Sequence, residues 1–216
     1  MKNLLLGSCL AVGLLALAPG AQADEILAFG QVGTLNSVTA TATGGTSTTL
    51  VATNVASNIT ALFGGGTPSA FFDLNAHSIG AASTLGNGFQ QNFAGTFSLT
   101  SLAGGAGINY LSGMFTDLAF GINTILLVGS SDPPDAITFT SSVIPAAELG
   151  QPRGIALSLS NFNPSVGLDG TTLSSGTASI TGTFDSAAAA VPEPFSMAMI
   201  GTGMIGLGMV KRRRSV

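Results

Sequence analysis

The stretch TASITGTF, residues 177–184, alternates hydroxyl-bearing side chains with apolar or small ones. Ala178, Ile180, Gly182 and Phe184 would share one face of an extended chain, and the Thr and Ser residues between them would share the other. Because successive side chains of a β-strand point to opposite sides, this period of two predicts a strand with one buried and one wet face. Such one-sided alternation is typical of antiparallel sheets.

The same alternation recurs along the chain between clusters of Gly, Pro, Asn and Asp that are typical of turns. These segments predict one domain over residues 24–186, an antiparallel β-sandwich, with a jelly roll as one form of it. Short helical turns remain an alternative at 47–63 and at 146–149. The expected strands cover residues 26–31, 38–43, 47–61, 71–79, 93–100, 109–120, 124–128, 136–143, 155–161 and 177–184.

The composition argues against most enzyme classes and against nucleic-acid binding. Only 7% of the 216 residues are charged, and there is one His and no Trp. Residues 24–190 contain nine acidic residues and a single basic one, Arg153, which gives this region a net charge of −8. Nucleic acid requires a basic patch, so it is not expected as a partner. The abundance of Gly, Ser and Thr suits an extracellular β protein.

The N-terminal residues 1–23 read as a secretory signal peptide. Lys2 gives the positive start, residues 4–18 are apolar, and Ala21-Gln22-Ala23 is an A-x-A cleavage site. Cleavage there would leave Asp24 as the new N-terminus and would require the Sec translocon and signal peptidase as partners. The only cysteine, Cys9, lies in this leader, so we expect a mature chain without disulfides.

The C-terminal residues 192–216 have the features of a second targeting segment. An Ala-rich linker, 187–191, leads to Pro192-Glu193-Pro194. Residues 195–210 carry no charge and predict a short transmembrane helix. Such a helix would span roughly 24 Å, which is somewhat less than the ~30 Å hydrocarbon core, and flanking residues and local thinning of the bilayer could close the gap. The basic tail 211–216 contains Lys211, Arg212, Arg213 and Arg214, which would stop transfer and stay in the cytoplasm.

These three parts, in this order at the chain end, resemble the PEP-CTERM sorting signal of exported proteins from Gram-negative bacteria that make exopolysaccharide. The resemblance covers about 26 residues and does not extend to residues 24–185. It implies that Pro192, Glu193 and Pro194 are recognised by an exosortase, a membrane-embedded processing enzyme that cuts nearby. It further implies that residues 195–210 anchor the precursor in the inner membrane only transiently, before release to the outer surface or the extracellular matrix.

The region between the two targeting segments, residues 24–186, contains few candidate catalytic or metal-binding residues. His77 shares its expected face with Asp73 and Asn75 and reads more readily as a surface histidine than as a catalytic base. Asp132 and Asp135 in Asp-Pro-Pro-Asp are candidates for a calcium loop, although a plain turn is the reading that the pattern favours. We therefore expect no catalytic residue, no metal and no cofactor.

The function expected from the sequence is that of a non-enzymatic envelope or biofilm-matrix protein. It would be structural, adhesive or associated with exopolysaccharide, and would present a hydroxyl-rich sheet surface to glycans or other matrix proteins. Two alternatives stay open. A secreted hydrolase acting on polysaccharide would need two carboxylates in a groove, and a calcium-dependent binding module would need several acidic oxygens on one loop.

Overall fold

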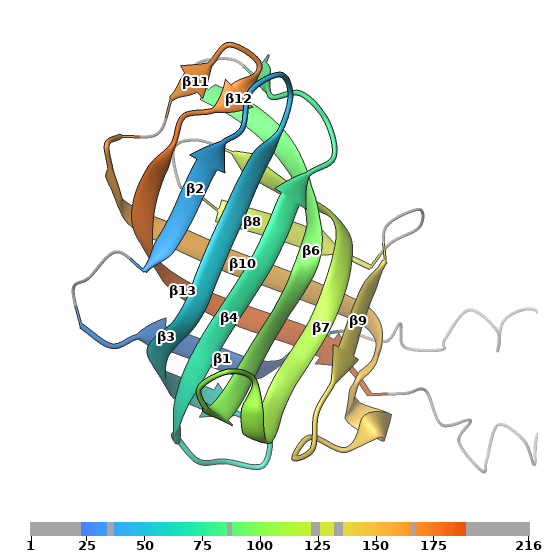
Figure 1. Ribbon diagram of the computed structural model, residues 1–216. Helices are drawn as coiled ribbons and strands as arrows, with labels where there is room; N and C mark the ends of the chain where they lie inside the picture. Colours follow the sequence, from blue (N-terminus) through green and yellow to red (C-terminus); the bar gives the residue numbers. More distant parts are fainter. Residues whose placement is uncertain are drawn as a thin grey trace, which may run out of the picture.

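The structure is a computed structural model that describes residues 23–33, 37–85, 88–121, 126–131, 136–165 and 167–188. Its described residues form an all-β fold dominated by one large antiparallel sheet (Figure 1). No helix in this part of the chain is both long and apolar enough to cross a membrane. The proposed signal peptide up to residue 22 and the sorting segment 192–216 lie outside the described residues.

Thirteen strands and one short 3-10 helix are described. The first seven strands are β1 (Asp24–Gln31), β2 (Val38–Ala42), β3 (Thr48–Leu62), β4 (Ser69–Ser78), β5 (Ser83–Leu85), β6 (Gly88–Leu102) and β7 (Ala106–Gly121). The remaining elements are β8 (Leu126–Ser130), β9 (Ile137–Thr140), η1 (Ala146–Glu148), β10 (Gly150–Asn163), β11 (Leu168–Asp169), β12 (Thr172–Leu173) and β13 (Gly176–Ala187).

The main sheet is a meander that closes on itself. Its order β6-β4-β3-β1-β13-β10-β8-β7 is completed by the pairing of β7 with β6. When β2, β5, β9, β11 and β12 are left aside, each of these eight strands pairs with the strands that precede and follow it in the chain. The first strand, β1, pairs with the last, β13. The described strands show none of the crossovers of a Greek key, so their connectivity differs from that of a jelly roll.

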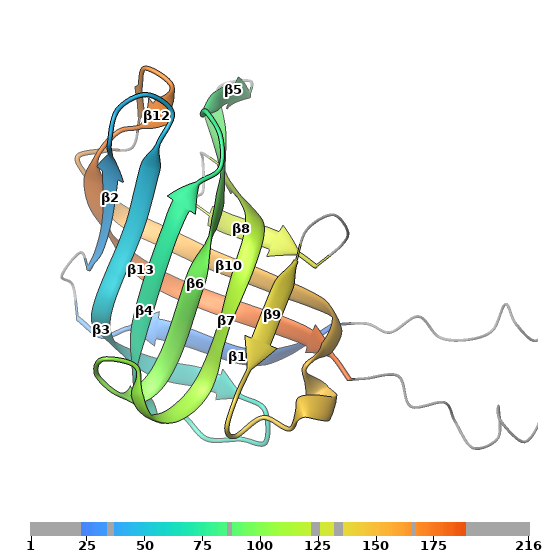
Figure 2. The same ribbon diagram turned by 45° about the vertical axis from the view of Figure 1, so that its right-hand side comes forward.

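Two halves of this closed sheet pack face to face. Figures 1 and 2 show β2, β3, β4, β6, β7 and β9 in a front layer and β1, β13, β10 and β8 in a back layer, with the strands of the two layers crossing steeply. The fold is therefore sandwich-like, as expected, but its layers belong to one continuous sheet rather than to two separate sheets. Small outer strands, β5 and β9, extend the front layer at β6 and β7.

The stretch 177–184 behaves as its alternation predicts. Ala178, Ile180 and Phe184 are fully buried in β13, while Thr181 on the opposite face is exposed. Gly182 is needed for space, because a Cβ there would come within 2.6 Å of both the Leu157 side chain and the Phe29 ring. The back layer can therefore approach the aromatic core closely at this point.

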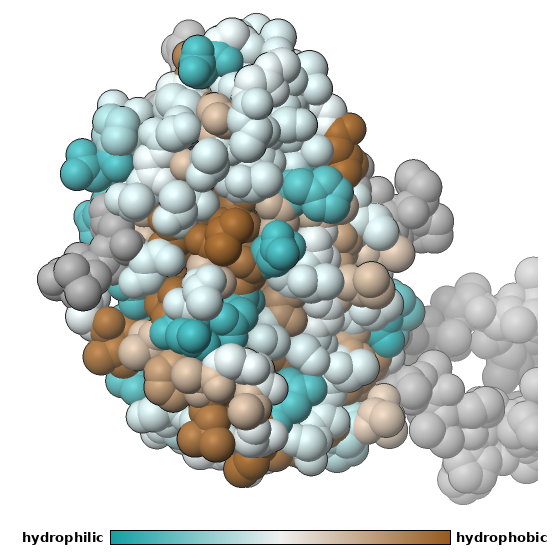
Figure 3. Space-filling model, viewed as in Figure 1, coloured by the Kyte–Doolittle hydropathy of each residue, from teal (hydrophilic) through white to brown (hydrophobic). Residues whose placement is uncertain are grey.

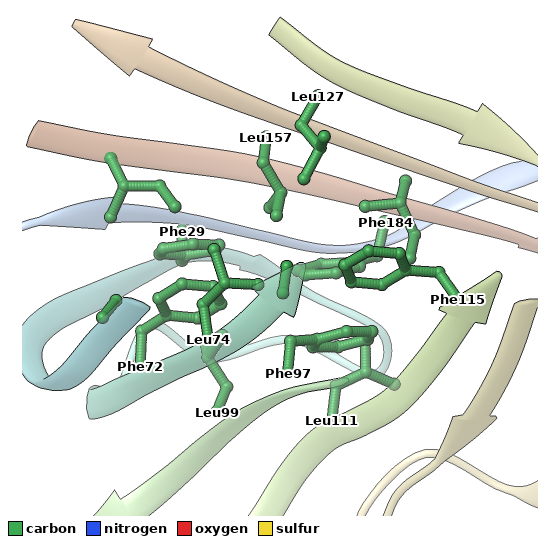
Figure 4. Packing of buried hydrophobic residues seen from close by; sticks show 14 of the residues in the cluster. Phe29, Phe72, Leu74, Phe97, Leu99, Leu111, Phe115, Leu127, Leu157 and Phe184 are labelled. Atoms are coloured by element: carbon green, nitrogen blue, oxygen red, sulfur yellow. The ribbon is translucent and has the colours of Figure 1, made fainter. Parts of the chain in front are cut away.

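The core between the layers is built around stacked phenylalanines. Phe29 of β1 stacks on Phe72 of β4 with ring centroids 4.6 Å apart, and Phe184 of β13 stacks on Phe97 of β6 at 4.7 Å. Figure 4 shows these rings meeting in the space between the layers, flanked by leucines such as Leu157. Each pair joins one strand of the back layer to one of the front layer, so the aromatic contacts hold the layers together.

Two local expectations are decided by the structure. The helical alternative for 47–63 is wrong, because this segment is the long strand β3. The helical turn expected at 146–149 is confirmed as η1. The strands β11 and β12, which flank the turn at Asp169-Gly170, were not expected.

Both ends of the described domain lie at the same end of the sheet. Asp24 in β1 is paired with Ser186 in β13, and Leu27 of β1 is paired with Leu62 at the end of β3. Because the neighbouring strands are antiparallel, the β3–β4 turn, the β6–β7 turn and the segment after β9 lie at this end as well. We call it the terminal end.

Candidate functional site

A hollow of about 590 Å³ lies on the outer face of the front layer. It runs across five adjacent strands, β3, β4, β6, β7 and β9, and we call it the front groove. The residues that line it are Val51, Ala52, Thr53, Asp73, Leu74, Asn75, Thr96, Phe97, Ser98, Ser112, Gly113, Met114, Thr138 and Thr140.

The register of the five strands sets the outward side chains of the front groove in two cross-strand rows. The first row is Val51, Asn75, Thr96, Met114 and Thr138. The second row is Asp73, Ser98, Ser112 and Thr140. Neighbouring strands are about 4.8 Å apart, so the first row extends over roughly 19 Å. The two rows thus present hydrogen-bonding side chains from β4, β6, β7 and β9 on one surface, with Val51 and Met114 as apolar members of the first row.

Hydrogen bonds order part of the second row. The hydroxyl oxygens of Ser112 and Thr140 lie 2.9 Å apart, and Nδ2 of Asn109 donates to the Ser112 hydroxyl at 2.9 Å. In the first row, Asn75 and Thr96 make no side-chain hydrogen bond within the described part of the chain and are exposed. The front groove therefore combines ordered hydroxyls with polar groups that are free to bind a ligand.

Asp73 lies where a β-bulge interrupts β3. Asn54 adopts a left-handed conformation in this bulge (φ 53°), and its backbone N–H donates to Oδ1 of Asp73 at 2.8 Å. The Asn54 side chain in turn accepts a hydrogen bond from the backbone N–H of Gly104, in the β6–β7 turn. Oδ2 of Asp73 is shielded from solvent and has no donor among the described residues. This oxygen has unused capacity to accept a hydrogen bond.

Apolar groups accompany the polar ones. The side chains of Val51 and Met114, both in the first row, are 39% and 53% exposed. Figure 3 shows apolar residues beside hydrophilic ones in the middle of this face. A surface of this mixed kind can meet a ligand that has both hydroxyl edges and C–H faces, as a sugar does.

The charge of the front groove comes from a single residue. Asp73 is the one charged side chain among the described residues that line it. Arg153, the only base between residues 24 and 190, lies elsewhere. Its Nη1 donates to the carbonyl of Ile137 at 2.8 Å, its Nε donates to that of Leu149 at 2.9 Å, and its guanidinium lies over the Phe139 ring. Burial lowers the pKa of Arg153 from its ordinary value. Its role is structural, because it joins β9 to the segment around η1.

His77 lies on the expected face. Asp73, Asn75 and His77 alternate with the buried residues Leu74 and Ala76 along β4, which confirms the predicted alternation. His77 is exposed, pairs across strands with Thr49 and Ala94, and does not line the front groove. The structure thus brings Asp73 and Asn75 into the candidate site and leaves His77 beside it.

The sequence did not predict an acidic pair in the back layer. Glu25 of β1 and Asp185 of β13 are direct cross-strand partners. Partial burial raises the pKa of Asp185 above its ordinary value. Neither residue lines the front groove, so these two carboxylates do not flank a ligand bound there. Only the strand register reveals the pair, since the two residues are far apart in the sequence.

The remaining predicted site residues fall mostly outside the described part of the chain. This holds for Asp132 and Asp135, for Ala21, for Pro192, Glu193 and Pro194, and for Lys211 to Arg214. Ala23 and Asp24 are described, and they stand immediately before β1 and at its first residue. Among the described residues no group of three or more His, Cys, Asp or Glu side chains could hold a metal ion.

Comparison of the chain with protein-family models, with curated proteins and with solved structures found no match in any of the three.

Proposed function

We propose that this chain is an exported, non-enzymatic protein of the bacterial envelope or exopolysaccharide matrix, and that its front groove contacts polysaccharide. The observation that carries the proposal is the pair of cross-strand rows, in which outward polar side chains of β4, β6, β7 and β9 lie beside the apolar Val51 and Met114. Hydroxyl, amide and carboxylate groups in such rows can exchange hydrogen bonds with the hydroxyls of an extended glycan. The exposed Val51 and Met114 supply apolar contact to the C–H faces of the sugar rings.

The charge of the domain favours a neutral polysaccharide over an acidic one. Residues 24–190 carry a net charge of −8, and the one charged side chain of the front groove is a carboxylate. Both would repel uronic acids or sulfated sugars. An uncharged glycan meets no such repulsion.

Export and sorting are part of the same proposal. Residues 1–23 would form the signal helix removed before Asp24, and residues 195–210 would form the transmembrane helix of the precursor. An exosortase-type enzyme would recognise Pro192 to Pro194, and the domain would then reach the outer surface or the matrix. The support for this comes from the sequence alone, through the A-x-A site, the Pro-Glu-Pro motif and the basic tail.

Binding can be tested by affinity gel electrophoresis, with polysaccharide from the protein's own host cast into the gel. The decisive variant is the double change Asn75→Ala and Thr96→Val, since both side chains are exposed and make no internal hydrogen bond among the described residues. Two lost hydrogen bonds of about 0.7 kcal/mol each would weaken binding about tenfold. We expect neutral polysaccharide to retard the wild type and to retard the double variant much less.

The matched control is Thr181→Val, which removes an exposed hydroxyl from the back layer. It should bind as the wild type does. Equal retardation of the wild type, the double variant and the control would show that the front groove does not bind the polysaccharide. Release of reducing sugar during the assay would favour the hydrolase alternative, and retardation that requires calcium would favour the calcium-dependent module.

A further inference from the structure

We propose that the terminal end of the domain rests on the lipid surface of the membrane that holds the tail, before the tail is cut. This inference depends on the proposed function in one respect, because it takes residues 195–210 as the anchor of the precursor. It adds an interaction surface that is separate from the front groove and that has a different partner.

Four exposed apolar side chains gather at the turns of the terminal end. Phe63, at the end of β3, is 42% exposed, and Val143, after β9, is also 42% exposed. Leu102 and Ile108 flank the β6–β7 turn and are 58% and 48% exposed. Figure 3 shows apolar residues along this lower end of the molecule. Exposed apolar side chains gathered in one region mark surfaces that meet a partner or a membrane.

Hydrogen bonds fix these side chains at one end of the sheet. The backbone N–H of Phe63 donates to the carbonyl of Ile26 in β1 at 2.8 Å. The backbone N–H of Ser142 donates to the carbonyl of Asn109 at 2.9 Å, which places Val143 near the start of β7 and Ile108. The turns carrying these residues are short and otherwise small or uncharged, with the sequences GGGTP at 64–68 and AGG at 103–105. Such tips can enter the headgroup region without burying a charge.

The chain leaves the domain at this same end. Ala187, the last strand residue, is paired with Gly150, and residues 188–194 separate it from the uncharged segment 195–210. Seven residues span at most roughly 25 Å when fully extended. A domain tied to its anchor by so short a linker must stay close to the bilayer, and the terminal end is the part nearest to it.

The charge of the terminal end selects the kind of lipid. Asp24, Glu25, Glu148 and Asp185 lie at or near it. Arg153 is the one base there among the described residues, and carbonyl oxygens accept the hydrogen bonds of its guanidinium. A net negative surface is repelled by anionic headgroups. The fitting partner is therefore a zwitterionic lipid surface, entered by apolar side chains without help from basic residues.

The test uses the full chain, exported by a bacterial host that lacks the tail-processing enzyme and then reconstituted into phosphatidylcholine vesicles containing a spin-labelled quencher lipid. Single cysteines are introduced in a Cys9→Ser background and labelled with a fluorophore. Leu102→Cys reports on the terminal end. Leu168→Cys is the matched control, because Leu168 is an exposed leucine (37%) in β11, which lies at the opposite end of the domain (Figure 1). Ser196→Cys reports on the tail.

We expect strong quenching at residues 102 and 196 and little at residue 168, and weaker quenching at residue 102 when half of the lipid is anionic at low salt. Quenching at residue 196 without quenching at residue 102 would overturn the inference, and so would equal quenching at residues 102 and 168. In both cases residues 195–210 would still be the membrane anchor. Absence of quenching at 196 would overturn the anchor itself, and with it both this inference and the sorting part of the proposed function. Glycan binding by the front groove would be unaffected in either case.

Discussion

Asn54 and Asp73 are joined across β3 and β4 by a 2.8 Å hydrogen bond from the backbone N–H of Asn54 to Oδ1 of Asp73. The bond exists because the bulge in β3 turns the Asn54 backbone into a left-handed conformation. The Asn54 side chain also accepts a hydrogen bond from the backbone N–H of Gly104 in the β6–β7 turn. One residue therefore positions the single carboxylate of the front groove and ties the β6–β7 turn to the same face.

Replacing Asn54 tests this arrangement. Asn54→Ala removes the acceptor for Gly104 and puts alanine, which lacks a polar side chain, in a left-handed conformation that Asn and Gly adopt more readily, so we expect a loss of about 2 kcal/mol in the free energy of unfolding. Asn54→Gly removes the same acceptor without the conformational cost, and should lose about 1 kcal/mol. Urea denaturation measures both. Equal losses for the two variants would show that the left-handed conformation does not matter to stability.

Gly182 should tolerate no side chain. A Cβ at this position would lie 2.6 Å from Leu157 and from the Phe29 ring, so Gly182→Ala should destabilise the protein by about 1–3 kcal/mol through overpacking. Gly30, in the neighbouring strand, is the control, because its Cβ would meet nothing nearer than 3.9 Å. Gly30→Ala should leave the thermal midpoint unchanged or raise it slightly. A Gly182→Ala protein as stable as the wild type would contradict the close packing described for the core.

Asp185 makes stability depend on pH. Partial burial raises the pKa of its carboxyl in the folded state, so the folded protein holds this proton more tightly than the unfolded chain does. Its favourable contribution is fully present below the unfolded pKa of about 3.9 and is lost as pH rises through the higher folded pKa. Asp185→Asn should therefore be more stable than the wild type at pH 7, and the difference should shrink as the pH falls towards 3. Urea unfolding at several pH values gives the comparison, and a difference that grows on acidification would reverse the sign argued here.

Glycan binding in the front groove should depend little on salt. The proposed contacts are hydrogen bonds and apolar contacts to an uncharged polymer, which salt does not screen. The dissociation constant for neutral polysaccharide should change less than about twofold between roughly 0.05 and 0.5 M NaCl, as measured by isothermal titration calorimetry. A dissociation constant that rises steeply with salt would indicate charge pairing, and with it a cationic group on the ligand.

The sequence predicts the long strands but not the short β5, β11 and β12, and β3 shows where its alternation becomes ambiguous. The buried positions of β3 run 48, 50 and 52, and then 55, 57 and 59. The bulge at residues 53 and 54 shifts the period of two by one residue, and the resulting spacing of three is also compatible with a helical turn. The alternation in 177–184 has no such interruption, and its buried and exposed faces follow from the sequence directly.

Closure of the sheet and the composition of the front groove are not readable from the sequence. Asp73 and Asn75 are near neighbours in one strand, so their common face could be predicted. Their partnership with Ser98 and Thr96 depends on strand register, which pairs residues that are more than twenty positions apart in the chain. The pairing of β1 with β13, which completes the closed sheet, joins the two ends of the domain and carries no local signal.

Polysaccharide binding by the front groove can be located residue by residue in an NMR titration of the ¹⁵N-labelled mature protein with oligosaccharides prepared from its host's neutral exopolysaccharide. We predict that the backbone amide signals that shift will belong to β3, β4, β6, β7 and β9, centred on Asn75, Thr96 and Ser98, while those of β10 and β13 stay in place. Shifts confined to the back layer, or no shifts at millimolar oligosaccharide, would contradict the assignment of the front groove as a polysaccharide-binding surface.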